Sequence, residues 1–194
     1  MIDYLFRVRL WHKHGALKPN RHTKPRPPLD AGKLERLALH YAGRYATTRS
    51  KLSAYLRRKL DERGWEGDGT PPVDGIVARF VELGYVDDQA FASSRAASLQ
   101  RRGYGERRIA QALQAAGIDE EDRQPAQAEA ADGAWAAALR YAQRKRIGPF
   151  APAAPDRLGR ERAFAAMIRA GHQIDYVRRV LNTPPGEIPN ADTM

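Results

Sequence analysis

Two adjacent carboxylates, Asp87 and Asp88, form the arrangement in this sequence that most resembles a catalytic or metal-binding pair. Neighbouring carboxylates can bind a divalent cation, or act as general acid and general base, as a nuclease requires. Both residues also stand at the start of an alanine-rich amphipathic stretch. There Asp87 suits the N-cap of a helix and Asp88 its first turn. The pattern favours a structural cap at Asp87 over catalysis.

Basic clusters are the second feature that could do chemistry. The planar fork of arginine binds phosphates and carboxylates, and glycines allow a partner to approach the backbone closely. The segment RRGYGERR combines both, although a short linker between helices with solvated arginines explains it equally well. The candidate partner-binding residues are Arg57, Arg58, Lys59, Arg101, Arg102, Tyr104, Arg107, Arg108, Arg144, Lys145 and Arg146.

The charge of the whole chain agrees with an anionic partner. Lysine and arginine outnumber aspartate and glutamate by 33 to 23, which gives a formal net charge of +10. Cations that neutralise phosphates release condensed counterions, so we expect weak, non-specific binding to single- or double-stranded DNA. An arginine-rich codon usage is the alternative explanation. No apolar run approaches the roughly 18 residues of a membrane span, and no membrane partner is expected.

Several classes of site are not indicated. The chain has no cysteine, which excludes disulfides, thiolate nucleophiles and iron–sulfur ligation and is typical of a cytoplasmic protein. Nucleotide-binding loops, zinc-protease motifs and serine-hydrolase motifs are not found. His12, His14 and His22 lie in a proline-rich stretch that offers no scaffold for a metal. We expect no catalysis, no cofactor and no metal.

The elements that position these residues form a repeat. Three segments, 50–65, 105–118 and 159–172, each carry an apolar pair four residues apart and a glycine four residues later. This spacing puts the pair on one helix face, and a terminal glycine suits the left-handed conformation that ends a helix. The three sets are Leu56, Leu60 and Gly64, then Ile109, Leu113 and Gly117, then Ala163, Met167 and Gly171.

Amphipathic stretches flank each of these segments. Those before them cover residues 34–46, 88–101 and 134–145, and those after them 73–83, 119–131 and 173–181. The stretch 119–131 contains Pro125, which a helix tolerates in its first turn but not in its interior. Strand patterns are almost absent. The fold class is therefore all-α, with three tandem three-helix repeats in an elongated, curved array.

The same patterns predict the division of the chain. We expect a basic, proline-rich and largely disordered tail over 1–32, repeats over 33–84, 85–132 and 133–182, and a disordered tail over 183–194. Each unit is too small to bury its apolar face alone and must pack on a neighbour. Basic clusters at similar places in successive units would form a long cationic surface.

In this order, the segments KLSAYLRRKLDERGW, GYVDDQAFASSR, RRGYGERRIAQALQAAGI and AFAAMIRAGHQIDYVRRVL resemble the RecX regulatory proteins of bacteria. The resemblance covers about residues 34–181. It implies tandem three-helix units and a cytoplasmic modulator of the RecA recombinase in homologous recombination, DNA repair and the SOS response. The chain departs from the family pattern in its basic extension before Leu34 and in the ending Ala170-Gly171-His172.

The resemblance also implies how the protein acts. It would bind as a monomer in the groove of the RecA–DNA filament and inhibit strand exchange, ATP hydrolysis and coprotease activity. A stand-alone DNA-binding protein of helix-turn-helix type is the alternative function, because three-helix units resemble such domains. A nuclease that uses Asp87 and Asp88 ranks last.

Overall fold

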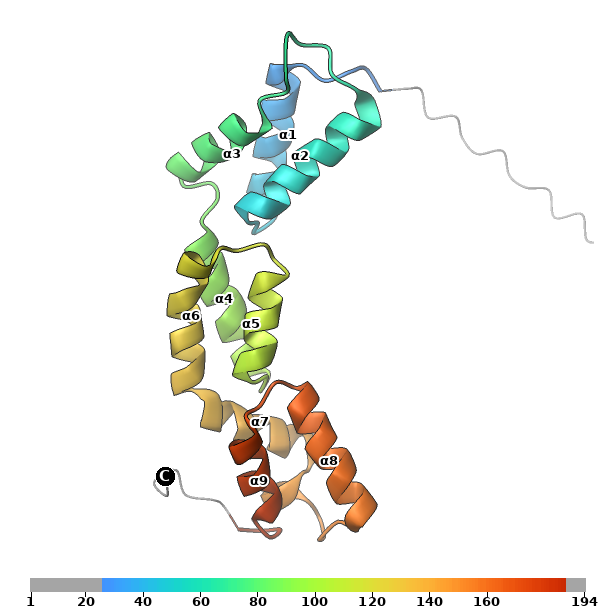
Figure 1. Ribbon diagram of the computed structural model, residues 1–194, viewed down its shortest axis with the longest axis vertical. Helices are drawn as coiled ribbons and strands as arrows, with labels where there is room; N and C mark the ends of the chain where they lie inside the picture. Colours follow the sequence, from blue (N-terminus) through green and yellow to red (C-terminus); the bar gives the residue numbers. More distant parts are fainter. Residues whose placement is uncertain (1–25, 188–194) are drawn as a thin grey trace, which may run out of the picture.

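In the computed structural model the described residues, 26–187, form nine α-helices and one short 3₁₀-helix, with no strand among them. The helices group into three successive units that follow one another along the long axis of a curved molecule (Figure 1). The predicted fold class is therefore confirmed. The predictions for residues 1–25 and 188–194 lie outside the described residues.

Each unit holds three α-helices. The first unit contains α1 (Ala31–Arg44), α2 (Arg49–Arg63) and α3 (Val73–Glu82). The second contains α4 (Asp88–Arg101), α5 (Glu106–Gln114) and α6 (Glu120–Asp132). The third contains α7 (Ala134–Lys145), the 3₁₀-helix η1 (Gly148–Phe150), α8 (Arg157–Arg169) and α9 (Ile174–Asn182). Each unit encloses its own cluster of buried apolar side chains.

The helix α6 contains Pro125 in its interior and nevertheless continues to Asp132. A proline there removes one backbone hydrogen bond and costs the helix about 3 kcal/mol. Ala126 and Ala130 follow it and are almost completely buried in the core of the second unit. Packing of these alanines offsets the cost of the proline, because tertiary packing contributes more to the stability of a helix in a protein than its intrinsic propensity does.

Both joints between units contain a hydrogen bond at equivalent positions, from a side chain in one and from the backbone in the other. In the first, the hydroxyl of Thr48, the N-cap of α2, donates to the carbonyl oxygen of Ala116 at 2.8 Å. In the second, the backbone nitrogen of Gly105, the N-cap of α5, donates to the carbonyl oxygen of Ala170 at 2.9 Å. The start of the middle helix in one unit therefore binds the end of the middle helix in the next.

The glycine after each of these carbonyl groups takes part in the joint. Gly117 and Gly171 have positive φ values of 70° and 92°. A Cβ atom on Gly117 would lie 2.5 Å from the Cβ atom of Ser50, and one on Gly171 would lie 2.7 Å from the Cβ atom of Arg108. Both glycines thus end a helix and let the neighbouring unit approach closely.

The folded part of the chain begins earlier than the boundary after residue 32 that the sequence predicts. Leu29 is fully buried in the core of the first unit. Its backbone nitrogen donates to Gly64 at 3.0 Å, and its carbonyl oxygen accepts from Glu66 at 2.9 Å. The correction has a simple cause: one leucine in a proline-rich stretch carries no periodicity, yet it covers the end of the first core.

The C-terminal boundary needs a similar correction. The disordered tail predicted from residue 183 begins with residues that the structure places, up to Glu187. The backbone nitrogen of Gly186 donates to the carbonyl oxygen of Pro149 at 2.9 Å, and the hydroxyl of Thr183 donates to that of Arg179. The first bond holds the segment after α9 against η1, and the second attaches its start to α9.

Candidate anionic-partner interface

The first basic cluster, Arg57, Arg58 and Lys59, lies on α2 with its charges paired. Arg57 contacts Asp74 at 2.9 Å, while Arg58 and Lys59 both contact Glu62. Each ion pair is exposed and contributes little to stability. These ion pairs matter more for the binding of an anionic partner, because the two carboxylates cancel part of the positive field of this cluster.

The segment Arg102–Gly105 lies at the joint between the second and third units. A Cβ atom on Gly103 would lie 2.7 Å from the backbone nitrogen of Tyr141, and one on Gly105 would lie 2.6 Å from that of His172. The ring of Tyr104 packs against the cores of both units. The glycines and the tyrosine of this segment therefore contact the next unit rather than an external partner.

The arginines around this segment point to the surface. Arg101, Arg102, Arg107 and Arg108 are all exposed. Arg108 lines a groove on the third unit, whereas Arg101, Arg102 and Arg107 do not. Of these four arginines, only Arg108 therefore belongs to the groove, and the other three lie elsewhere on the surface.

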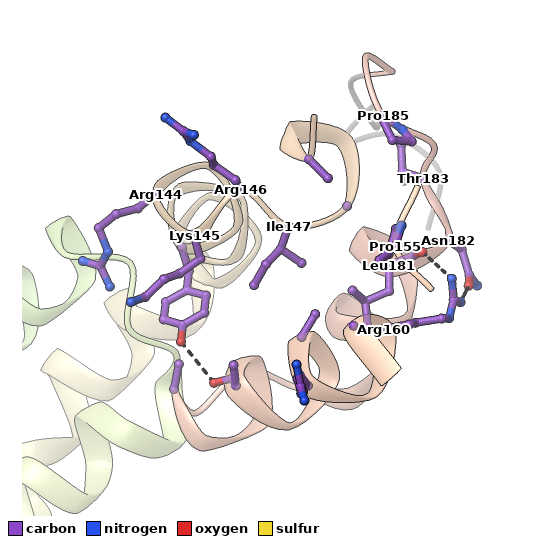
Figure 2. A pocket seen from close by; sticks show the side chains of 18 of the residues that line it. Arg144, Lys145, Arg146, Ile147, Pro155, Arg160, Leu181, Asn182, Thr183 and Pro185 are labelled. Atoms are coloured by element: carbon purple, nitrogen blue, oxygen red, sulfur yellow. Dashed lines mark hydrogen bonds between the residues drawn. The ribbon is translucent and has the colours of Figure 1, made fainter. Parts of the chain in front are cut away.

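The third basic cluster, Arg144, Lys145 and Arg146, borders a groove of about 1090 Å³. We call it the basic groove. It runs between the end of α7, the helix α8 and the segment after α9, with Arg144, Lys145 and Arg146 on one side and Arg160 and Asn182 on the other (Figure 2). Its basic side chains are Arg108, Arg144, Lys145, Arg146, Arg160, Arg162 and Arg169.

Within residues 26–187, no aspartate or glutamate lines the basic groove. Among residues 26–187, none of its seven basic side chains forms a salt bridge. The remaining described lining is neutral and consists mostly of alanines, glycines and prolines, with Tyr104, Tyr141, Ile147 and Leu181 as its larger side chains. The groove therefore concentrates positive charge with no compensating carboxylate, unlike the cluster on α2.

Local backbone features shape the groove. Arg146 ends α7 in the left-handed conformation, with a φ of 54°, which turns the chain sharply into η1. Gly148 follows with a positive φ, and a Cβ atom there would press on the backbone of Val180. This close contact fixes the end of α7 against α9, so the three consecutive basic residues lie on a rigid rim.

Two of the arginines are held in place by neutral partners. Arg144 donates to the backbone oxygen of Arg102, and its guanidinium lies 5.7 Å from the ring centre of Tyr104 and 5.4 Å from that of Tyr141. Arg160 donates to the carbonyl oxygen of Leu181 at 2.7 Å and to the side chain of Asn182. Neither interaction cancels the charge, so both arginines are ordered and still cationic.

The sequence candidates do not include Arg160, Arg162 and Arg169, which supply the α8 side of the groove. Arg162 and Arg169 are seven residues apart and so share one helix face. That spacing was a usable signal. The apolar residues of α8 lie on another face of the helix, so the apolar pattern does not reveal these two arginines.

The carboxylates that open the second unit have separate structural partners. Asp87 is the N-cap of α4, and its side chain accepts from the backbone nitrogen of Ala90 at 2.8 Å. Asp88 is buried and accepts from the backbone nitrogen of Arg49 at 2.9 Å and from its Nε at 3.3 Å. Arg49 also contacts Asp119 and Asp122. Asp88 thus caps α2 in the preceding unit and ties the first joint together.

Of the two histidines in the folded part, His40 is exposed and His172 is buried at the second joint. The His172 ring stands edge-on to Tyr141, with 5.3 Å between ring centres. Burial lowers the pKa of His172 to about 4, so the ring is neutral at physiological pH. It packs as a neutral aromatic group between two units.

Comparisons with known proteins agree on one family. A family model described as "RecX, second three-helix domain" matches residues 87–126, the region of the second unit. A protein of Myxococcus xanthus named "Regulatory protein RecX" is 35% identical over 160 residues, which cover 78% of this chain and 86% of the relative. A protein of the same name from Escherichia coli is 32% identical over 117 residues, covering 57% and 70%.

Solved structures show the same fold. The crystal structure of RecX from Lactobacillus salivarius superposes with a TM-score of 0.57 at 18% identity, covering 78% of this chain and 94% of that one. A second, titled "Crystal structure of regulatory protein RecX", has the same TM-score at 21% identity. Within residues 26–187, no helix has the length and apolar character needed to cross a membrane.

Proposed function

Because this chain belongs to the RecX family of regulatory proteins, we propose that it binds the RecA–DNA filament and inhibits the recombinase. The inhibited activities are strand exchange, ATP hydrolysis and coprotease activity. The protein acts as a monomer in the cytoplasm, in homologous recombination, DNA repair and the SOS response. The relatives named for a regulatory role support the proposal, since the similarity spans most of both chains.

The observation that carries the proposal for this chain is the elongated array with an uncompensated basic groove at one end. A filament repeats the same surface along its axis, and an array of rigidly joined units can contact several consecutive copies at once. Such multivalent contact strengthens binding without any single strong contact. The positive groove adds attraction to the anionic surfaces that a protein–DNA filament exposes.

The proposal is tested by the ATPase activity of RecA on single-stranded DNA. We expect a stoichiometric amount of this protein to slow ATP hydrolysis, with heat-denatured protein as the control. Unchanged hydrolysis at stoichiometric amounts, under conditions where the protein is folded, would refute the proposal. A gel-filtration measurement of the free protein tests its monomeric state.

The alternative, a stand-alone protein of helix-turn-helix type, is disfavoured by the charge on the third helix of each unit. The first turn of α6 carries three acidic residues, and Asp74 and Asp175 begin α3 and α9. A helix with carboxylates at its start is repelled by the phosphates that flank the major groove. Tight, sequence-selective DNA binding without RecA would favour this alternative.

The proposal also assigns the protein no catalytic role. A nuclease would use Asp87 and Asp88, and both carboxylates are already engaged as helix caps. Asp88 is in addition too buried to meet a substrate. Magnesium-dependent DNA cleavage that is lost on Asp88→Asn would contradict this assignment.

A further inference from the structure

We infer that the basic groove of the third unit binds the phosphodiester backbone of nucleic acid, and that it is the DNA-contacting part of this protein. The inference deepens the proposed function and rests on it for its biological setting. Binding of DNA by the protein alone can nevertheless be measured without RecA, so the two can fail separately.

The charge of the groove favours a polyanionic ligand. Among the described residues seven cations and no carboxylate line one groove, and like charges that share a groove repel one another. A ligand with closely spaced negative charges relieves that repulsion and releases the small anions that otherwise gather there. A nucleic-acid backbone carries one such charge at every nucleotide. A peptide matches that density only where nearly every residue is acidic.

Some neutral polar side chains of the lining are already hydrogen-bonded within the protein. Among the neutral polar side chains in the lining, the hydroxyl of Tyr141 already donates to the carbonyl oxygen of Ala166, and Asn182 accepts from Arg160. The lining also contains Gly159, Ala163 and other small residues, which let the backbone of a ligand approach closely. The groove therefore offers mainly its cations to a ligand, which suits phosphates.

Two of the cations in the groove are already ordered. Arg144 is fixed over two tyrosine rings and Arg160 is fixed on the carbonyl oxygen of Leu181, one on each side of the groove (Figure 2). Cations that are already ordered lose less side-chain entropy when a ligand binds. Guanidinium groups also hold phosphates through two parallel hydrogen bonds. The basic cluster on α2, whose charges are paired with Asp74 and Glu62, offers neither advantage.

The test uses the full chain without RecA and follows the fluorescence anisotropy of a labelled oligothymidylate. The groove variant combines Lys145→Gln, Arg162→Gln and Arg169→Gln, three exposed side chains with no salt bridge among the described residues. A matched control removes three exposed charges outside the groove, with Arg36→Gln, Arg157→Gln and Arg178→Gln. Circular dichroism checks that both variants keep the helical fold.

We expect the groove variant to bind at least about tenfold more weakly than the wild type and the control less than about threefold more weakly. The dependence of log K on log salt should fall by about 2 in the groove variant, as expected for three lost contacts to a single strand. Equal losses in the two variants would show that only net charge matters and would overturn the inference. So would an unchanged groove variant.

Two further arms identify the ligand. A duplex of the same length, compared with the single strand, shows which form of the phosphodiester backbone the groove prefers, and preference for either agrees with the inference. Polyglutamate at equal charge concentration should displace the oligonucleotide poorly. If it displaces the oligonucleotide as well as unlabelled nucleic acid does, the groove is a site for acidic protein and the inference is wrong. A groove variant that loses DNA binding but still slows RecA would leave both proposals standing.

Discussion

The most direct test of the array architecture is the replacement Gly171→Ala at the joint between the second and third units. Gly171 ends α8 with its backbone nitrogen bonded to Ile168 at 3.0 Å and that of His172 bonded to Met167 at 3.3 Å. Gly84 ends α3 with the same pattern, bonding to Val81, and has a similar positive φ of 72°. Gly84→Ala is therefore a matched control.

The two alanines differ in what their Cβ atoms meet. At Gly84 nothing lies within 4 Å, so the expected cost is that of a left-handed residue with a side chain, about 1–2 kcal/mol. At Gly171 the Cβ atom would lie 2.7 Å from the Cβ atom and 3.0 Å from the Cα atom of Arg108. Backbone there cannot move without opening the joint, which adds about 1–3 kcal/mol of overpacking.

The free energy of unfolding of both variants can be measured by urea denaturation followed by circular dichroism. We expect Gly171→Ala to be less stable than Gly84→Ala by about 1–3 kcal/mol, the overpacking contribution alone. Faster amide exchange at Gly105 and Arg107, which donate to Ala170 and Gly171, would locate the loss at the joint. Equal stability of the two variants would refute the close contact between these units.

Three further predictions concern stability. Asp88→Asn should lower the free energy of unfolding by about 1–3 kcal/mol in urea denaturation, because a buried carboxylate holds the start of α2, while exposed Asp87→Asn should change it by less than about 0.5 kcal/mol. Below about pH 6.5 the histidine of the unfolded chain binds a proton, whereas His172 in the folded protein stays neutral down to about pH 4. The free energy of unfolding should therefore drop by about 3 kcal/mol between these pH values, and His172→Gln should reduce this drop in pH-dependent melting. Leu56→Ala should cost about 2–5 kcal/mol in thermal unfolding and Leu60→Ala less than about 2, since only Leu56 is fully buried.

Periodicity predicted the helices of this chain well, because each unit buries one face of each helix. The bounds of α4 and α7 agree with the expected ranges 88–101 and 134–145. The same pattern misjudged Leu60, which the repeat places on the buried face of α2 but which is only partly covered. Residues 26–187 place no unit before the first that could cover that end of the helix, and a repeat pattern does not show where a helix end stays uncovered.

The basic groove was only half predictable, for a different reason. Arg144, Lys145 and Arg146 are consecutive and stand out in the sequence. Arg108, also a sequence candidate, joins them across a joint between units, whereas Arg160 comes from α8 and was not a candidate. The residues that the sequence did not indicate, Arg160, Arg162 and Arg169, lie on α8 of the same unit, and helical periodicity carries no information about how α7 and α8 pack against each other.

The position of the groove follows from the joint that builds the array. At α2 and α5 the helix start is covered by the end of the middle helix of the next unit, through Thr48 and Gly105. The equivalent helix start in the third unit is that of α8, capped by Asp156, and residues 26–187 place no further unit there. Gly159 and Arg160, just beyond that cap, line the basic groove instead. The surface that joins units elsewhere is thus open at this end of the described array, and a ligand can occupy it.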